Sequence, residues 1–430
     1  MVSIEKLVYG GDGLAHEGDR TVFVPFVLPG EEIRVAAKSQ KKKLVWATPT
    51  EIVRPAEARI KPRCAHFTKC GGCQYQHVDA AQQPRLKKAI LQETLSRLGA
   101  VQWREEIREH VAAPFEYRNR AQWAARSAMP RALGYYLPES STILPIDECP
   151  VLSPVLSETF QKLQNLTRSN TLPAQIEEIE AFADSADEKL ALNIAFHEFA
   201  VPSTTLIQFF REALPRLESL LLLDKKKNRF ELSGPGYLMH KAGGFDFRVS
   251  HLSFFQVNRF LIEDLLRSVV SGKKGGLALD LYAGVGFFSL PLAKTFERVI
   301  SVDANLSATR DLHSNAGAAG LTITSHNLHT EEFLKKFDEK PDLVVLDPPR
   351  AGLGQATSAK LAELNAPEIV YLSCDPSTLA RDLAVFLQTE RMPAGAKPKA
   401  APYEIASIEL FDLFPQTHHV ETLVHLRLRT

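Results

Sequence analysis

The chain has 430 residues, and its 51 basic and 51 acidic side chains give a formal net charge of zero. A composition of 45% hydrophobic and 24% charged residues is typical of a globular protein and excludes a disordered chain, a collagen-like repeat and a disulfide scaffold. No segment reaches the roughly 18 uninterrupted apolar residues of a membrane helix. The zero net charge argues against a uniformly basic nucleic-acid coat but allows a local basic patch.

The N-terminus carries charges where a signal peptide needs an apolar core. The cysteine count is five, an odd number, which does not suit a disulfide framework. We therefore expect a cytoplasmic protein without a membrane partner, acting as a monomer, in which clustered cysteines bind metal or perform chemistry.

Residues 1–55 alternate short β-like runs with the turn signals GGDG and PGEE, which predicts a small OB-like β-barrel. Residues 56–250 predict a central α+β domain, with helices over Ala80–Leu98, capped by Gly99, and near Leu152–Leu166 and Thr204–Leu221. Residues 251–430 alternate apolar strands with helical patterns, apart from a loop-like insert at 392–402. This rhythm predicts an α/β, Rossmann-like domain with a parallel, doubly wound sheet.

A candidate cofactor site begins where the strand Leu277–Leu281 runs into Tyr282 and the sequence AGVG. Glycines at the carboxyl end of a first strand let a ligand approach the backbone, and the next strand ends in Asp303, whose carboxylate can accept both hydroxyls of a ribose. The dinucleotide pattern GxGxxG is absent, because Ser289 occupies the third glycine position. A nucleoside cofactor without a pyrophosphate fits, and S-adenosylmethionine is the usual one.

Asp347 ends another strand, in LDPPR. This segment is similar to the [DN]PP[YFW] signature of amino-methyltransferases, but Arg350 replaces the aromatic residue that stacks on the base. The replacement disfavours methylation of an amine and leaves Asp347 to orient cofactor or base.

Cys374, in YLSCDPSTL, lies between a predicted strand and a helix, where the helix N-terminus can lower the pKa of a thiol. A thiol paired with a methyl donor suggests uracil chemistry: addition to C6 makes C5 nucleophilic, and a base must later remove the C5 proton. Glu421, at the start of the last predicted strand, is the candidate base.

Cys64, Cys70 and Cys73 lie within ten residues of one another, and Cys149 follows in IDECP. Four cysteines suit a [4Fe–4S] cluster or a zinc site, and zinc could also recruit His66 or His77. Two further segments predict RNA contacts: the lysines at 38 and 41–43, and YRNRAQW at 117–123, where arginines alternate with aromatic residues.

Together these motifs resemble the RNA 5-methyluridine methyltransferase family, in its iron–sulfur branch that carries a TRAM domain. The similarity spans essentially the whole chain and includes VYGGDGLAHEGDR, CAHFTKCGGCQYQH, HLSFFQVN, DLYAGVGFF, SVDAN, LDPPRAGL, SCDPSTLARDL and HHVET. It implies a TRAM-type RNA-binding barrel at 1–55, an iron–sulfur domain at 56–250 and a methyltransferase domain at 251–430.

The resemblance also implies roles for single residues. Cofactor contacts are implied for Gln256, Tyr282, Asp303 and Asp347, and [4Fe–4S] ligands for Cys64, Cys70, Cys73 and Cys149. Cys374 is implied as nucleophile, Glu421 as base and Phe254 as a neighbour of the target base. Phe287 departs from the family, since some members have a polar cofactor contact there.

The sequence therefore predicts S-adenosylmethionine-dependent methylation of uracil C5 in RNA. 23S ribosomal RNA is favoured as substrate, because the iron–sulfur and TRAM features together resemble the ribosomal branch. Transfer RNA is the alternative. A non-catalytic RNA-binding or RNA-folding protein is a further hypothesis, although a pure binder has no need of Gln256, Asp303, Cys374 and Glu421.

Overall fold

The computed structural model describes residues 1–126, 129, 131–388 and 402–429, so most of the predicted insert at 392–402 lies outside it. Contacts divide the chain into two compact units. The first contains Met1–Val111, Pro348–Ala362 and Leu372–Thr430; the second contains Ala112–Asp347 and Glu363–Tyr371. Neither unit is one continuous stretch of sequence, so the three-domain division at residues 55 and 250 stays a prediction.

The N-terminal part of the first unit is a six-stranded sheet in the order β1-β5-β6-β4-β3-β2. Its strands are β1 (Val2–Ser3), β2 (Lys6–Leu7), β3 (Gly13–Glu17), β4 (Arg20–Val24), β5 (Glu32–Lys41) and β6 (Leu44–Arg54). Small aliphatic side chains such as Ala15, Val24 and Ile33 fill its core. The predicted β-rich N-terminal region is confirmed.

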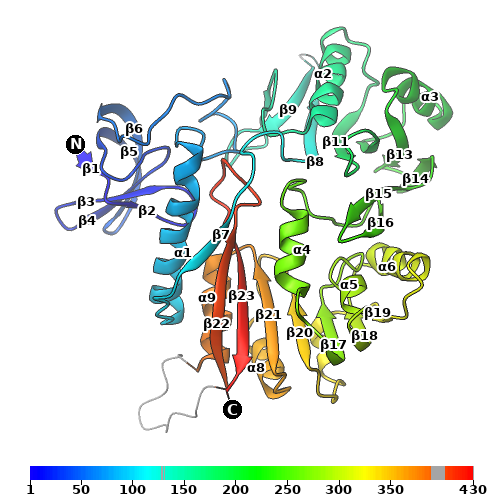
Figure 1. Ribbon diagram of the computed structural model, residues 1–430. Coiled ribbons are helices and arrows are strands. Elements are labelled where there is room, and N and C mark those ends of the chain that lie inside the picture. The colour runs from blue at the N-terminus through cyan, green and yellow to red at the C-terminus, as the bar shows by residue number, and fades with distance from the viewer. Residues whose placement is uncertain (127–128, 130, 389–401, 430) are drawn as a thin grey trace. The chain divides into compact units, whose positions relative to one another are not determined.

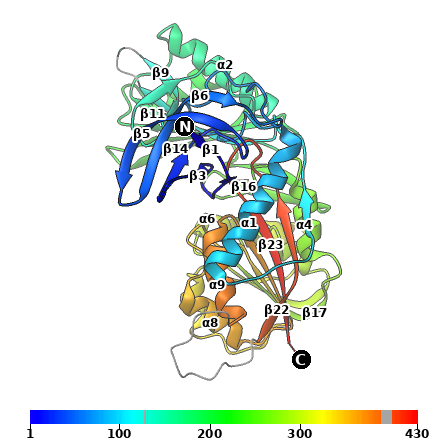
Figure 2. The same cartoon turned by 90° about the vertical axis from the view of Figure 1, so that its left-hand side faces the viewer.

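The rest of the first unit combines helices with three strands. Its elements are the 3-10 turn η1 (Ala80–Gln82), α1 (Gln83–Gly99), β7 (Ile107–His110), α8 (Gln355–Glu363), α9 (Pro376–Phe386), β22 (Tyr403–Phe411) and β23 (Glu421–Leu428). β22 pairs antiparallel with β23 and parallel with β7. Helices α1 and α9 pack side by side, as Figure 2 shows.

The helix predicted over Ala80–Leu98 is confirmed as η1 and α1, but its cap differs. Gly99 is the last helical residue, and the left-handed residue is Ala100, with φ at 53°. Close packing between helices requires a glycine at position 99, because a Cβ on Gly99 would lie 2.5 Å from the carbonyl oxygen of Ala380 in α9. Gly99 therefore serves the close approach of two helices.

The second unit begins with a seven-stranded sheet, β10-β9-β8-β11-β12-β13-β14. Its elements are β8 (Arg120–Arg126), β9 (Ala132–Tyr136), β10 (Ile143–Pro145), α2 (Pro154–Arg168), β11 (Ile176–Ala183), β12 (Leu190–Phe196), α3 (Ser203–Ala213), β13 (Leu217–Asp224) and β14 (Arg229–Ser233). The helix predicted over Thr204–Leu221 is wrong in its second half. α3 ends at Ala213, and the leucine run that follows is the strand β13.

The remainder of the second unit holds the parallel sheet. Its elements are β15 (Tyr237–Ala242), β16 (Phe245–Ser250), α4 (Ile262–Val270), β17 (Gly275–Leu281), α5 (Ser289–Leu292), β18 (Phe296–Val302), α6 (Leu306–Ala318), β19 (Thr324–His326), α7 (Thr330–Leu334), β20 (Leu343–Leu346) and β21 (Glu368–Ser373), whose last two residues belong to the first unit.

The strands β19-β18-β17-β20-β21 lie in this order, and every pairing among them is parallel (Figure 1). The predicted α/β architecture is confirmed. The chain moves from β17 to β18 on one side and later returns to β20 on the other, which makes the carboxyl end of β17 a topological switch point where ligands bind in such sheets.

Among the described residues, no helix is long and apolar enough to cross a membrane.

Candidate active site

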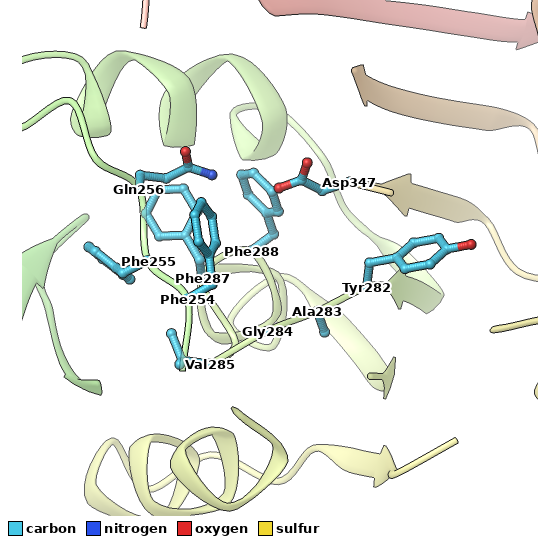
Figure 3. A pocket seen from close by; sticks show the side chains of 10 residues that line it. All are labelled: Phe254, Phe255, Gln256, Tyr282, Ala283, Gly284, Val285, Phe287, Phe288 and Asp347. Carbon is cyan, nitrogen blue, oxygen red and sulfur yellow. The ribbon is translucent and has the colours of Figure 1, made fainter. Parts of the chain in front are cut away.

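A pocket opens at the carboxyl end of β17, the topological switch point of the parallel sheet. It contains about 340 Å³ of space outside protein atoms. Its lining residues are Phe254, Phe255, Gln256, Tyr282, Ala283, Gly284, Val285, Phe287, Phe288 and Asp347 (Figure 3). Three of the four predicted cofactor residues therefore line one pocket, and the fourth, Asp303, touches its glycine loop.

The loop after β17 has a backbone shaped for close approach. Gly284 and Gly286 have φ values of 56° and 89°, and a Cβ on Gly286 would lie 2.7 Å from Leu290. A Cβ on Gly284 would meet no protein atom within 4 Å. Tyr282 also has a positive φ, 63°, a strained conformation for a bulky residue. Its ring points away from Gln256 and Phe287 in Figure 3.

Asp303, directly after β18, holds this loop in place. Its Oδ2 accepts the amide of Gly284 at 2.8 Å, and its Oδ1 accepts the amide of Asn305 at 2.7 Å. Asn305, not Asp303, caps helix α6, because its side chain accepts from the amides of residues 307 and 308. Each oxygen of Asp303 keeps a second lone pair, so the carboxylate can still accept hydroxyl groups of a ligand.

Two carboxyl groups of this region have raised pKa values: Asp280, within β17, and Asp347, which lines the pocket. Burial raises the pKa of Asp280 to about 7, although the Ser289 hydroxyl donates to it and opposes the shift. Burial, together with the negative charge of Asp303, raises the pKa of Asp347 to about 7. Burial thus disfavours the charged form of both carboxyl groups, and a cationic ligand nearby would stabilise that form.

Gln256 lies in the irregular segment between β16 and α4. Two side chains from an earlier part of the chain hydrogen-bond to the main chain of this segment. The Asn119 side chain donates to the Gln256 carbonyl at 3.3 Å, and Arg120 Nη1 donates to the Ser253 carbonyl at 2.8 Å. Arg120 also pairs with Glu180 at 2.8 Å. Figure 3 shows the Gln256 amide directed toward the side of the pocket that holds Asp347. One arginine of YRNRAQW thus supports the cofactor segment, a role that the sequence did not reveal.

Cys374 follows β21 directly and precedes helix α9. The Asp375 side chain caps this helix, since its Oδ1 accepts the amides of Ser377 at 2.8 Å and Thr378 at 3.1 Å. Pro376 occupies the first turn, where a missing N–H costs nothing. The half-buried thiol therefore lies at the positive end of a helix, as predicted.

Glu421 is the first residue of β23, only 6% exposed, and stands opposite Phe411 of β22. Hydrogen bonds connect the loop that precedes Glu421 to residues that follow the cysteine motif. The amides of Gln74 and Tyr75 both donate to the Gln416 carbonyl at 2.9 Å. The Gln74 side-chain oxygen accepts from the amide and the Nδ1 of His418, at 3.2 Å and 3.1 Å.

Sequence reasoning did not predict two contacts of this unit, one of which reaches the nucleophile. The Tyr9 hydroxyl lies 3.5 Å from the Cys374 carbonyl oxygen, and Arg350 Nη2 lies 3.1 Å from His419 Nε2. Tyr9 precedes Cys374 by 365 residues, so no local pattern could have connected them.

The cysteine motif forms a compact loop in the first unit. The Cys70 amide donates to the His66 carbonyl, and the Gly72 amide approaches the Cys70 sulfur at 3.4 Å. Burial and the neighbouring Cys64 raise the pKa of the Cys70 thiol. Within the described part of the chain, however, no three histidine, cysteine or acidic side chains are grouped closely enough to hold a metal ion. Cys149 belongs to the second unit, where the Tyr135 hydroxyl approaches its sulfur at 4.0 Å.

Comparison with known proteins adds the family. The family model described as tRNA (Uracil-5-)-methyltransferase matches residues 238–429. An RNA methyltransferase of Aquifex aeolicus, whose specific activity is uncharacterized, is 31% identical over 100% of this chain and 98% of its own length. The 23S rRNA (uracil(1939)-C(5))-methyltransferase RlmD of Alkalilimnicola ehrlichii is 30% identical over 98% of this chain and 95% of its own.

This chain belongs to the RNA uracil-C5 methyltransferase family. The fold of the methyltransferase agrees with that assignment. It resembles the crystal structure of Pyrococcus abyssi tRNA (uracil-54, C5)-methyltransferase in complex with S-adenosyl-L-homocysteine, with a TM-score of 0.75 and 23% identity. That similarity covers 99% of this chain and 100% of the other. The shared fold thus extends beyond residues 238–429, the segment that the family model matches.

Proposed function

We propose that this methyltransferase converts uridine to 5-methyluridine in RNA with S-adenosylmethionine as methyl donor and Cys374 as nucleophile. The observation that carries the proposal is the place of Cys374 between β21 and the capped N-terminus of α9. There a thiolate is favoured by the partial positive charge of the helix.

The pocket at the end of β17 fits the methyl donor. The glycine loop admits a ligand close to the backbone, Asp303 can accept the ribose hydroxyls, and Gln256 and Asp347 offer polar contacts within the pocket. The aromatic rings of Phe287 and Phe288 give it an apolar wall, which suits the adenine base. S-adenosylmethionine, when bound, supplies the methyl group as a sulfonium cation, and the raised pKa values of Asp280 and Asp347 favour that charge.

Cys374 starts the reaction by forming a bond from its sulfur to uracil C6. The C5–C6 double-bond electrons move toward O4, which makes C5 nucleophilic enough to take a methyl group from bound S-adenosylmethionine. The sulfur of the donor would keep the bonding electron pair, so that S-adenosylhomocysteine is the second product. Glu421 then removes the proton from C5, the double bond re-forms and the C6–sulfur bond breaks. Thiolate and methylated base are released together. Glu421, at the start of β23 and only 6% exposed, supplies the carboxylate that accepts this proton.

The test uses RNA that contains 5-fluorouridine. After methyl transfer, C5 carries fluorine in place of the proton, so the adduct cannot break down. We expect a covalent protein–RNA complex, with the modified peptide containing Cys374. The Cys374→Ala variant should form none and should not methylate RNA. Turnover by that variant would overturn the mechanism.

The Glu421→Gln variant separates the base from the nucleophile. It should bind and attack natural uridine RNA but stall after methyl transfer, so that the covalent adduct accumulates. Glu404→Gln changes an exposed carboxylate on the neighbouring strand β22 and serves as control. Normal release of 5-methyluridine by Glu421→Gln would contradict the assignment.

We also propose that the RNA substrate is 23S ribosomal RNA and that the N-terminal sheet is a TRAM-type RNA-binding module. The support is the similarity to a 23S rRNA methyltransferase over nearly the full length of both chains. Transfer RNA is the alternative substrate, because the matching family model and the similar crystal structure both carry transfer-RNA names.

Finally, we propose that Cys64, Cys70, Cys73 and Cys149 hold a [4Fe–4S] cluster. Thiolates are the natural ligands of such a cluster, and the Gly72 amide offers the type of hydrogen bond that cluster sulfurs accept. Since the part of the chain that the structure describes has no grouping of side chains that could hold a metal ion, we assign the cluster no step in the reaction. Anaerobic purification should yield equal iron and acid-labile sulfide, both lost in Cys70→Ala. Zinc without sulfide would favour the alternative metal.

A further inference from the structure

Tyr9 reaches the catalytic loop from the turn between β2 and β3. Its hydroxyl lies 3.5 Å from the Cys374 carbonyl oxygen, at the long limit of a hydrogen bond, and the charge of the Asp375 carboxylate acts on it as well. The phenol hydroxyl is therefore close to two acceptors on consecutive residues. These acceptors are the main chain of the proposed nucleophile and the carboxylate that caps helix α9.

The turn that carries Tyr9 is fixed in this place. The Val8 amide donates to the Asp12 carbonyl at 2.8 Å, and Gly10 and Gly11 have φ values of 106° and 98° that side chains rarely allow. A Cβ on Gly11 would lie 3.1 Å from the Gln74 Cβ and 3.4 Å from the His418 Cβ. The turn thus packs closely against the segments on both sides of it.

The Tyr9 ring is held as well as its hydroxyl. It meets the His418 ring edge-on, with centroids 5.7 Å apart and an interplanar angle of 77°. Burial and the nearby Arg350 and Lys87 lower the pKa of His418, so its imidazole is neutral at pH 7. Because the His418 ring is neutral, packing rather than charge orients the phenol of Tyr9.

Burial and the charges around Tyr9 keep its hydroxyl protonated, so that it can donate a hydrogen bond. Burial and the negative charges of Asp375 and Cys374 raise its pKa well above the usual range, while Arg350 opposes them. A neutral phenol is a hydrogen-bond donor beside the Asp375 carboxylate, whose negative charge stands one residue from the thiol. Without that donor, the carboxylate charge would disfavour the thiolate more strongly.

We propose that Tyr9 is a positioning residue of the methyltransferase, which holds the Cys374–Asp375 turn so that the thiolate forms readily and faces the target base. The proposal rests on the proposed function, because it assumes Cys374 as nucleophile. It makes the N-terminal sheet part of the catalytic apparatus as well as a candidate RNA-binding surface.

The Tyr9→Phe variant tests it by removing only the hydroxyl. One hydrogen bond is worth about 0.5–1.5 kcal/mol, so we expect kcat and the rate of adduct formation with 5-fluorouridine RNA to fall about three- to tenfold. RNA and S-adenosylmethionine affinities should stay within about twofold of wild type, since the phenyl ring remains. Tyr136→Phe, which alters an exposed tyrosine of β9, is the matched control.

A second readout is independent of turnover. Alkylation of Cys374 by iodoacetamide, followed peptide by peptide across the pH range, reports where the thiolate forms. Loss of the Tyr9 donor should move the half-point to higher pH, whereas a purely structural residue would not shift it.

The outcomes separate the two proposals. If wild type traps RNA through Cys374 but Tyr9→Phe keeps its rate and alkylation profile, the role of Tyr9 is wrong. The role is also overturned if the variant loses RNA affinity at unchanged kcat, since Tyr9 would then be an RNA contact. If wild type forms no adduct at Cys374, the proposed mechanism fails first.

Discussion

The carboxyl group of Asp347 links the electrostatics of the pocket to cofactor binding. Its pKa is raised to about 7 by burial and by Asp303, so a large fraction of the cofactor-free protein is protonated there near neutral pH. A sulfonium cation nearby favours the ionised form. Binding of S-adenosylmethionine should therefore release a proton from this group.

The affinity for S-adenosylmethionine should therefore increase as the pH rises through 7. Below pH 7, part of the binding free energy is spent on removing the proton from Asp347, and above pH 7 it is not. Calorimetry should show S-adenosylmethionine binding up to about tenfold more tightly at about pH 8 than at about pH 6, with a plateau at higher pH.

Asp347→Asn should abolish most of this dependence, leaving only the contribution of Asp280, which titrates in the same range. Asp246→Asn, at an exposed position of β16, should keep the wild-type profile. Affinity that falls as the pH rises from 6 to 8 would refute the coupling.

Much of the residue-level site could be predicted, for a physical reason. The carboxyl ends of parallel strands converge at one edge of the sheet, so Tyr282 and Asp347, each just after a strand, had to lie near one another. Tyr9, Asn119 and Arg120 could not be predicted. Their contacts with the site depend on tertiary packing between distant segments.

At the scale of elements, helix α1 supports the loop that precedes Glu421. Lys87 is fully buried, and its Nζ donates to Asp412 Oδ1 at 2.6 Å and to the Phe414 carbonyl at 2.9 Å. Gln83, one turn earlier, donates to the Gln416 side chain at 3.0 Å and accepts from its amide at 2.8 Å. The helix thus satisfies the polar groups of a buried loop.

Breaking the buried pair should be costly. Lys87→Met leaves the Asp412 carboxylate without its partner, and we expect a loss of about 3–5 kcal/mol in the free energy of unfolding, measured by urea denaturation. The exposed Arg97→Met change on the same helix should cost at most about 1 kcal/mol.

The double variant Lys87→Met/Asp412→Leu makes the test specific. Since it removes both charges, it should recover a large part of the loss. A cost in Lys87→Met no greater than that of Arg97→Met would contradict the role assigned to the pair.

Elements with a clear period were predictable, and those decided by tertiary contacts were not. The spacing of Ile90, Leu91 and Leu95 predicts α1, because these side chains share one buried face of the helix. The helix predicted near Thr204–Leu221 reaches into the leucine run, but Leu217–Asp224 is β13, a strand paired on both sides with β12 and β14. A short apolar run has no period that distinguishes the two.

At the scale of the whole molecule, a net charge of zero coexists with a basic tip on the hairpin between β5 and β6. Lys41 and Lys42 are exposed there. Another lysine run, at 225–227, forms ion pairs with Glu177 and Glu198. The first run is therefore better placed to meet a phosphate backbone.

This contrast gives a matched experiment. Lys41→Ser/Lys42→Ser should weaken RNA binding about three- to tenfold at low salt and reduce the slope of log Kd against log salt concentration. Lys226→Ser/Lys227→Ser removes the same charge and should change the affinity far less. Equal effects of both double variants would show that net charge alone governs RNA binding.

The five cysteines divide by position as well as by predicted role. Cys374 directly follows a strand of the parallel sheet, whereas Cys64, Cys70 and Cys73 lie in one loop. Spacing indicated a metal loop, but it could not specify the metal or how Cys149 joins it, because those depend on geometry beyond the local chain.

The most direct test of the account maps 5-methyluridine by mass spectrometry in ribosomal and transfer RNA from cells with and without this protein. We predict that one 5-methyluridine in 23S ribosomal RNA disappears without the protein and returns with wild type but not with Cys374→Ala. Unchanged 5-methyluridine in both RNA classes would contradict the activity, and a loss confined to transfer RNA would contradict the substrate.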